Sequence, residues 1–150
     1  MSATPEPGAG TPAPHAQPRV PALLVMHADL ATALLRAAEK VYGDVSGVQV
    51  VSNEGLDKPQ IEERIAAEVA GWTAGGLVLT DFWGGSCHTC ALAAARGRGS
   101  ILLITGVNLP MLIDYLHNRE RYGVDELAER MLQRGRDNIR TQRGPGTPNA

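Results

Sequence analysis

A chain of 150 residues has room for one domain with a substantial core, since a chain of this size buries roughly two-thirds of its unfolded surface. Its formal net charge of −2 and pI of about 6.1 provide no long-range attraction to nucleic acid, so no nucleic-acid partner is expected. No segment reaches the roughly 20 apolar residues that cross a bilayer and the start is not a signal peptide, so we expect a cytoplasmic protein without direct membrane insertion, whose two cysteines are thiols.

Residues 1–19 are mostly Pro, Ala, Gly, Ser and Thr, a composition that predicts a disordered extension. The apolar run 22–26 follows and predicts a strand that is buried on both faces. Asp29 can cap a helix that ends at Gly43. The residues of this helix that we expect to face the core, from their helical spacing, are Leu30, Leu34, Ala38 and Val41.

A second strand is predicted at 48–51, and the helix after it begins with a capping box of Asp57 and Gln60. Its predicted buried stripe is Ile61, Ile65 and Val69. The third strand, 77–80, ends in a carboxylate, a Gly-Gly turn and a Ser-x-x-Thr that could begin a helix. Residues 90–96 are predicted to form that short helix.

A fourth strand is predicted at 101–105, after which Asn108 can cap a helix with Pro110 in its first turn. The last helix is predicted at 125–139. Four arginines near its end are interpreted as cations that complement the helix dipole: Arg134, Arg136, Arg140 and Arg143. A flexible tail at 142–150 completes the prediction, which leaves 20–141 as the folded domain.

Strict alternation of strands and helices predicts an α/β fold, a doubly wound and mainly parallel four-stranded sheet with helices on both faces. Ligands of such sheets bind beyond the carboxyl ends of the strands. The polar residues that follow predicted strands, and that we therefore expect at one edge, are His27, Asp81, Ser86 and Asn108.

His27 and Asp81 together favour phosphoryl transfer. A carboxylate that binds one ring nitrogen of a histidine leaves the other nitrogen as a nucleophile. The turn Gly84-Gly85-Ser86 offers backbone N–H groups, a hydroxyl and the positive end of a helix to a phosphoryl group. The sequence contains no Walker motif or kinase loop, so the phosphoryl donor is expected to be another protein.

Three segments resemble the signatures of the mannose-family IIA domain of the bacterial phosphoenolpyruvate-dependent sugar phosphotransferase system. They are Val25-Met26-His27, the run Leu79-Thr80-Asp81-Phe82-Trp83-Gly84-Gly85-Ser86, and the run from Ile104 to Leu112 that contains Gly106-Val107-Asn108-Leu109-Pro110. The similarity covers roughly residues 21–140, in family order and at family-like spacing.

The resemblance implies a cytoplasmic phosphocarrier, usually a homodimer, with sheet order 2-1-3-4 and no cofactor. Such a protein accepts a phosphoryl group from phospho-HPr on a histidine Nε2 and passes it to a IIB component, which phosphorylates the incoming sugar. On this resemblance His27 is the phosphoacceptor and Asp81 orients its Nδ1. Gly84, Gly85 and Ser86 match the loop that surrounds the phosphoryl group. Apart from the resemblance, Trp83 and Asn108 are candidate partner contacts, because an exposed tryptophan beside a reactive site can anchor a partner and a capping asparagine can also contact one.

The chain departs from the family after the two glycines, where it reads Ser86-Cys87-His88-Thr89 instead of Ser-Pro-Phe-Asn. Cys87 and Cys90 suggest zinc or redox chemistry, but one such pair is a weak signal, and we interpret both as packing thiols and expect no metal. His88 is either a second phosphoacceptor or an ordinary residue of a helix start. Trp83 either packs beneath the loop or anchors a partner.

Three other functions fit parts of the sequence. A stand-alone regulatory module would use phosphorylation of His27 as a signal to a transcription factor or kinase, without a permease. The phosphotransfer subunit of dihydroxyacetone kinase also has a histidine after its first strand, but the run Trp83 to Ser86 argues against it. A nucleotide- or flavin-binding domain would suit the fold but needs a glycine fingerprint that this sequence lacks.

Overall fold

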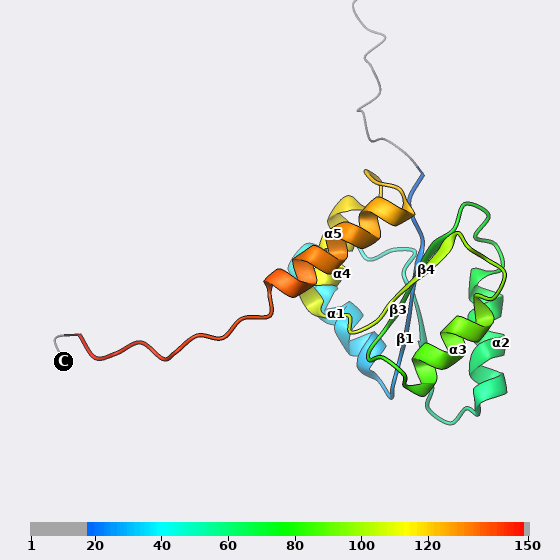
Figure 1. Cartoon of the computed structure of the whole chain (residues 1–150), viewed down its shortest axis with the longest axis horizontal. Helices are drawn as coiled ribbons and strands as arrows, with labels where there is room; N and C mark the ends of the chain where they lie inside the picture. Colours follow the sequence, from blue (N-terminus) through cyan, green and yellow to red (C-terminus); the bar gives the residue numbers. More distant parts are fainter. Residues whose placement is uncertain (1–17, 149–150) are drawn as a thin grey trace, which may run out of the picture.

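The computed structural model describes residues 18–148, which form a four-stranded parallel sheet with helices on both faces (Figure 1). The strands are β1 (Ala22–Met26), β2 (Gln49–Ser52), β3 (Gly76–Thr80) and β4 (Ile101–Ile104). Their order is β2-β1-β3-β4, with every pair parallel, which confirms the predicted doubly wound α/β fold.

Five helices connect and follow the strands: α1 (Leu30–Tyr42), α2 (Lys58–Val69), α3 (Ser86–Ala94), α4 (Leu109–Asn118) and α5 (Val124–Asp137). Figure 1 shows α1, α4 and α5 on one face of the sheet and α2 and α3 on the other. Each face has its own apolar core. Successive residues of β1 point into opposite cores, with Leu24 and Met26 in one and Leu23 and Val25 in the other, so the strand is apolar throughout.

Two of the predicted caps hold their helices as expected. Asp57 and Gln60 make both hydrogen bonds of the capping box of α2, each 2.9 Å long. The Asn108 side chain accepts a hydrogen bond from the Met111 amide at 3.2 Å, and Pro110 lies in the first turn of α4. These helices therefore begin where their capping residues are.

The prediction of the buried face of α1 was partly wrong. Leu30 and Val41 are 45% and 63% exposed, whereas Ala31 and Ala38 are buried and Leu34 is partly buried. Two apolar stripes overlap in this Leu- and Ala-rich helix, and the structure buries the stripe that contains Ala31 and Ala38. Asp29 is the N-cap residue of α1, as predicted, but its side chain makes no capping hydrogen bond.

The prediction that the third helix spans 90–96 was wrong as well, because α3 begins at Ser86 and its N-cap residue is Gly85. The Gly-Gly turn reverses the chain early enough for the helix to start there. Gly84 has a φ of +81°, which favours glycine, and a Cβ on Gly85 would lie 2.6 Å from the Phe82 ring. Ser86 is thereby free to face the end of β1 and does not act as a cap.

The described residues at the two ends of the chain differ in their contacts with the domain. The predicted extension 1–19 lies outside the described residues except for Pro18 and Arg19, and Arg19 pairs with Glu120 at 2.8 Å. After α5, residues 139–148 form no helix or strand, and Figure 1 shows this segment leading away from the domain. Within residues 18–148, no helix has the length and apolar character that crossing a membrane requires.

Candidate active site at the carboxyl edge of the sheet

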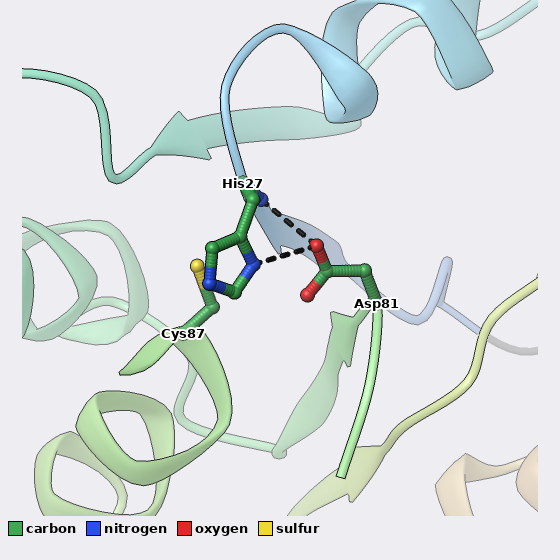
Figure 2. A group of neighbouring side chains, drawn as sticks. All are labelled: His27, Asp81 and Cys87. Atoms are coloured by element: carbon green, nitrogen blue, oxygen red, sulfur yellow. Dashed lines mark hydrogen bonds and ion pairs between the residues drawn. The ribbon is translucent and has the colours of Figure 1, made fainter. Parts of the chain in front are cut away.

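His27 and Asp81 meet because they follow two adjacent parallel strands. Val25 of β1 pairs with Thr80 of β3, so both residues emerge at the same edge of the sheet. The Asp81 Oδ2 atom lies 2.7 Å from His27 Nδ1 (Figure 2). The sequence-based expectation that these two side chains face each other is confirmed.

The Asp81 carboxylate fixes both the backbone and the ring of His27. Oδ2 accepts the His27 backbone N–H at 2.9 Å in addition to the ring contact, and Oδ1 accepts the Phe82 N–H at 3.1 Å. Burial alone would raise the pKa of Asp81, but the hydrogen bonds from the His27 backbone and ring outweigh burial and hold the pKa below its usual value. Asp81 is therefore an ionised acceptor, which favours a His27 ring that carries its proton on Nδ1 and its lone pair on Nε2.

The residue after His27 is held in an unusual backbone conformation. Ala28 has a φ of +51°, the only positive φ among the described residues other than glycine. The end of β2 holds it there, because Asn53 Oδ1 accepts the Ala28 N–H at 3.0 Å and the Ser52 hydroxyl donates to the Ala28 carbonyl at 2.6 Å. Two neighbouring strands, β2 and β3, thus position the end of β1 from both sides.

Ser86 lies on the other side of the imidazole. Its Oγ is 3.3 Å from His27 Nε2, at the first residue of α3. The first amides of an α-helix have no partner within the helix, and the helix dipole makes that end positive. The His27 side chain is 33% exposed, and the start of α3 beside Nε2 is electrostatically suited to an anion.

The two predicted phosphate-binding glycines have different surroundings. Gly84 donates its backbone N–H to His88 Nδ1 at 2.8 Å, so this amide has a partner inside the loop. Gly85 lies against the Phe82 ring, at the start of α3. Of this turn, Ser86 lies nearest to His27 Nε2, and Gly85 and Ser86 form the positive end of α3.

His88 is 4% exposed, and its Nδ1 accepts the Gly84 amide. Its ring also contacts the Trp83 ring, with centroids 4.6 Å apart. A buried ring whose Nδ1 is already engaged suits a structural role better than that of a second phosphoacceptor. Sequence reasoning missed this role because the contact spans the Gly-Gly turn, whose shape a residue pattern does not specify.

Phe82 is a further residue that sequence reasoning missed. Its ring stacks on the His27 ring with centroids 4.9 Å apart and an angle of 26° between the planes, and it remains 52% exposed. It therefore covers one face of the imidazole. Its position directly after Asp81 was the only signal in the sequence that could have indicated this contact.

The two candidate partner contacts differ in position. Trp83 is 78% exposed and does not pack beneath the loop. It borders a groove of about 580 Å³ whose other lining residues come mainly from β4 and α5. Asn108 is half-buried, and its amide is engaged within the domain, with Met111 and with the Gly135 carbonyl at 3.2 Å. Among the described residues, Asn108 makes no hydrogen bond to His27.

Both cysteines are buried free thiols in the core beneath α2 and α3. Burial, with the nearby Asp81 carboxylate as a second cause, raises the pKa of Cys87 from 9.0 to about 11, and burial also raises the pKa of Cys90. Their burial agrees with the interpretation of both as packing residues. Cys87, however, also lies beside His27 and Asp81 (Figure 2).

Comparison with known proteins identifies relatives of this chain. The family model EIIA-man, described as "PTS system fructose IIA component", matches residues 22–132. The mannose-specific EIIAB component of the Escherichia coli (strain K12) phosphotransferase system is 31% identical over 120 residues, which cover 76% of this chain and 36% of that protein. The chain thus spans about a third of the length of the curated relatives it matches.

Solved structures show the same fold. The mannose/sorbose-specific IIA subunit from Enterococcus faecalis has 24% identity and a TM-score of 0.75, over 87% of this chain and 99% of that one. Component EIIA from Streptococcus agalactiae has 22% identity and a TM-score of 0.76, over 81% of this chain and 96% of that one.

Proposed function

Because the chain belongs to the EIIA-man family of phosphotransferase-system IIA components, we propose that it is a cytoplasmic phosphocarrier that uses His27 as its phosphoacceptor. Membership of this family implies a phosphocarrier role in a sugar phosphotransferase system. In the proposed cycle, phospho-HPr donates a phosphoryl group to His27 Nε2, and a IIB component then accepts it for sugar uptake. The chain is thus a phosphotransferase component with protein substrates and no cofactor.

The observation that carries the proposal is the contact of 2.7 Å between Asp81 Oδ2 and His27 Nδ1. With the ring proton on Nδ1, the Nε2 lone pair attacks phosphorus. The N–P bond forms as the bond to the donor breaks, and the leaving electron pair stays with the donor. The phosphorylated ring gains positive character, which the Asp81 carboxylate stabilises.

The surroundings of Nε2 suit a phosphoryl group. The Ser86 hydroxyl, 3.3 Å from Nε2, can turn to donate to a phosphoryl oxygen, and the first amides of α3 provide further donors. Phosphoryl transfer depends mainly on such positioning and charge stabilisation. Phe82 and Trp83, both exposed beside the acceptor, are the side chains best placed to contact HPr and IIB.

The test is transfer of radiolabel from phosphoenolpyruvate through enzyme I and HPr. We expect the full chain to be labelled, and His27→Ala to be unlabelled, while His117→Ala, which changes an exposed histidine on α4, labels like the wild type. The label should survive base and be lost in acid, as a phosphohistidine is. Labelling of His27→Ala at the wild-type rate would refute the proposal.

The regulatory alternative, in which His27 phosphorylation only signals to a transcription factor or kinase, is not favoured by these relatives. The relatives of the chain named above are components of sugar phosphotransferase systems. Transfer of label from the phosphorylated chain to a purified IIB component tests the transport role directly. Stable labelling without any transfer to IIB would favour the regulatory alternative.

We also propose a homodimer. Strand β4 is at an edge of the sheet, so one side of its backbone is open to pairing. The groove beside it is lined by apolar residues such as Leu102, Ile104 and Leu132, together with the charged residues Asp125, Glu129 and Arg136. Light scattering coupled to gel filtration should give twice the mass of 15.9 kDa. A monomeric mass at micromolar concentration would contradict the dimer.

A further inference from the structure

Cys87 is the nearest thiol to the proposed phosphoacceptor, although phosphoryl transfer does not use it. A ring nitrogen of His27, a carboxylate oxygen of Asp81 and the Cys87 sulfur all lie within 4.8 Å of one another (Figure 2). The three side chains come from the ends of β1 and β3 and from the first turn of α3. Within residues 18–148 this is the one group of three His, Cys, Asp or Glu side chains at such spacing.

These three ligand types are the ones that zinc prefers. Tetrahedral zinc with bonds of about 2.0–2.3 Å to nitrogen, oxygen and sulfur separates its ligand atoms by roughly 3.3–3.6 Å. The largest separation in the cluster, at most 4.8 Å, therefore has to close by only about 1 Å, which small side-chain rotations provide. The His27 and Asp81 side chains are 33% and 10% exposed, so an ion can reach the cluster from solvent.

We propose that His27, Asp81 and Cys87 bind one zinc ion, and that bound zinc prevents His27 from accepting a phosphoryl group. This site differs from the sequence-based expectation of no metal. Three protein ligands would leave a fourth position for water, as in open zinc sites. An ionised Asp81 and a Cys87 thiolate would balance the two positive charges of the ion.

Zinc binding at this site should release a proton. The buried Cys87 thiol is protonated at neutral pH, so zinc must displace its proton. One proton should therefore leave for each zinc ion bound, and affinity should rise with pH. The raised pKa of Cys87 weakens zinc affinity near pH 7 but does not prevent binding, because a coordinated thiol is deprotonated by the metal.

The inhibitory effect follows from the single lone pair of a neutral imidazole. Zinc on Nε2 takes the lone pair that would attack phosphorus. Zinc on Nδ1 moves the proton to Nε2, with the same result. The proposal that zinc binds does not depend on the phosphocarrier role, whereas the proposal that zinc inhibits rests on the proposed function.

The binding test uses the reduced, metal-free full chain. Titration calorimetry should show one zinc ion per chain and about one proton released. Cobalt(II) in place of zinc should give a sulfur-to-cobalt charge-transfer band, which reports thiolate ligation without any substitution. Cys87→Ala should lose this band and bind zinc on the order of 100-fold more weakly, and Cys90→Ala, which removes the other buried thiol of α3, should behave like the wild type.

Absence of the cobalt band in the wild type, or equal zinc affinity in Cys87→Ala and the wild type, would overturn the site. Circular dichroism establishes that each variant is folded. The cobalt spectrum of the wild type keeps the test decisive even if Cys87→Ala does not fold.

The inhibition test starts from purified phospho-HPr and measures single-turnover transfer, with each variant compared with its own rate without zinc. Zinc should inhibit the wild type and Cys90→Ala equally, and the inhibiting concentration should rise on the order of 100-fold in Cys87→Ala. An effect of zinc on the donor would be the same in all three proteins. Zinc binding without any transfer in zinc-free buffer would refute the phosphocarrier proposal alone, and transfer that zinc leaves unchanged would refute the inhibition alone.

Discussion

Asp81 is the residue on which the proposed chemistry of His27 depends most. Its two oxygens accept three hydrogen bonds, two from His27 and one from the Phe82 amide. An amide in its place has one acceptor oxygen and one donor nitrogen, so at least one of these N–H groups would face another donor.

We therefore expect Asp81→Asn to slow phosphoryl transfer to His27 by about 100-fold or more, because the ring loses both its fixed tautomer and the charge that stabilises the product. Rapid-quench single-turnover labelling measures the rate. Asp29→Asn is the matched control, since this neighbouring carboxylate makes no capping hydrogen bond and should transfer at the wild-type rate. Equal rates in the two variants would remove Asp81 from the mechanism.

His88 contributes at the same scale by holding the glycine turn. Its Nδ1 accepts the Gly84 N–H at 2.8 Å, and this bond links the loop to the buried side of α3. We expect His88→Leu to speed hydrogen exchange of the Gly84 amide by about fivefold, the factor that corresponds to about 1 kcal/mol for one hydrogen bond. NMR exchange on labelled protein measures it, with His117→Leu as the control. Unchanged exchange of the Gly84 amide in His88→Leu would show that the turn keeps its shape without the His88 hydrogen bond.

At the scale of the elements, the turn between β1 and α1 stores backbone strain beside the active site. Ala28 adopts a positive φ that costs a residue with a Cβ about 1 kcal/mol, and its side chain is exposed, so it contributes little packing. The hydrogen bonds from Ser52 and to Asn53 keep it in place.

Ala28→Gly should accordingly stabilise the protein, by about 0.5–1 kcal/mol in denaturant unfolding. Ala33→Gly, at an exposed position within α1, should destabilise it by about 1 kcal/mol, since the same exchange there removes helix propensity. The two substitutions are chemically identical, so opposite signs isolate the backbone conformation. If both substitutions destabilised the protein, the positive φ of Ala28 would not be a source of strain.

The elements also show where sequence reasoning succeeds. The apolar runs predicted four strands, and the rule for parallel sheets predicted that His27 and Asp81 lie at the same edge of the sheet. The rotation of α1 was predicted less well, because Leu30 and Ala31 begin two overlapping stripes and only packing against the sheet decides between them. The approach of Cys87 to His27 depends on where α3 begins, which the Gly-Gly turn determines through one positive φ and one close contact with Phe82.

The whole molecule is stabilised by two separate cores, one on each face of the sheet, and Cys87 and Cys90 belong to the core beneath α2 and α3. Burial of the Cys87 thiol makes the stability of the protein depend on pH. Its pKa is about 11 in the folded protein, raised from 9.0, so the folded state binds this proton more tightly than the unfolded state does.

The resulting stabilisation is fully present below pH 9 and is lost as the pH rises from about 9 through about 11. In urea unfolding of the metal-free protein, we expect the stability advantage of the wild type over Cys87→Ala to shrink across this window, by on the order of 2 kcal/mol. Other alkaline-titrating groups cancel in this difference. A difference that stays constant from pH 8 to about 11 would show that the thiol does not ionise before the protein unfolds.

The double attachment of His27 to Asp81 has a consequence for how two proteins can use one imidazole. One carboxylate oxygen accepts hydrogen bonds from both the main chain and the ring of His27, so the ring is held in one orientation. In the proposed cycle, HPr and the IIB component would therefore bind the same surface around His27 one after the other, and not both at once.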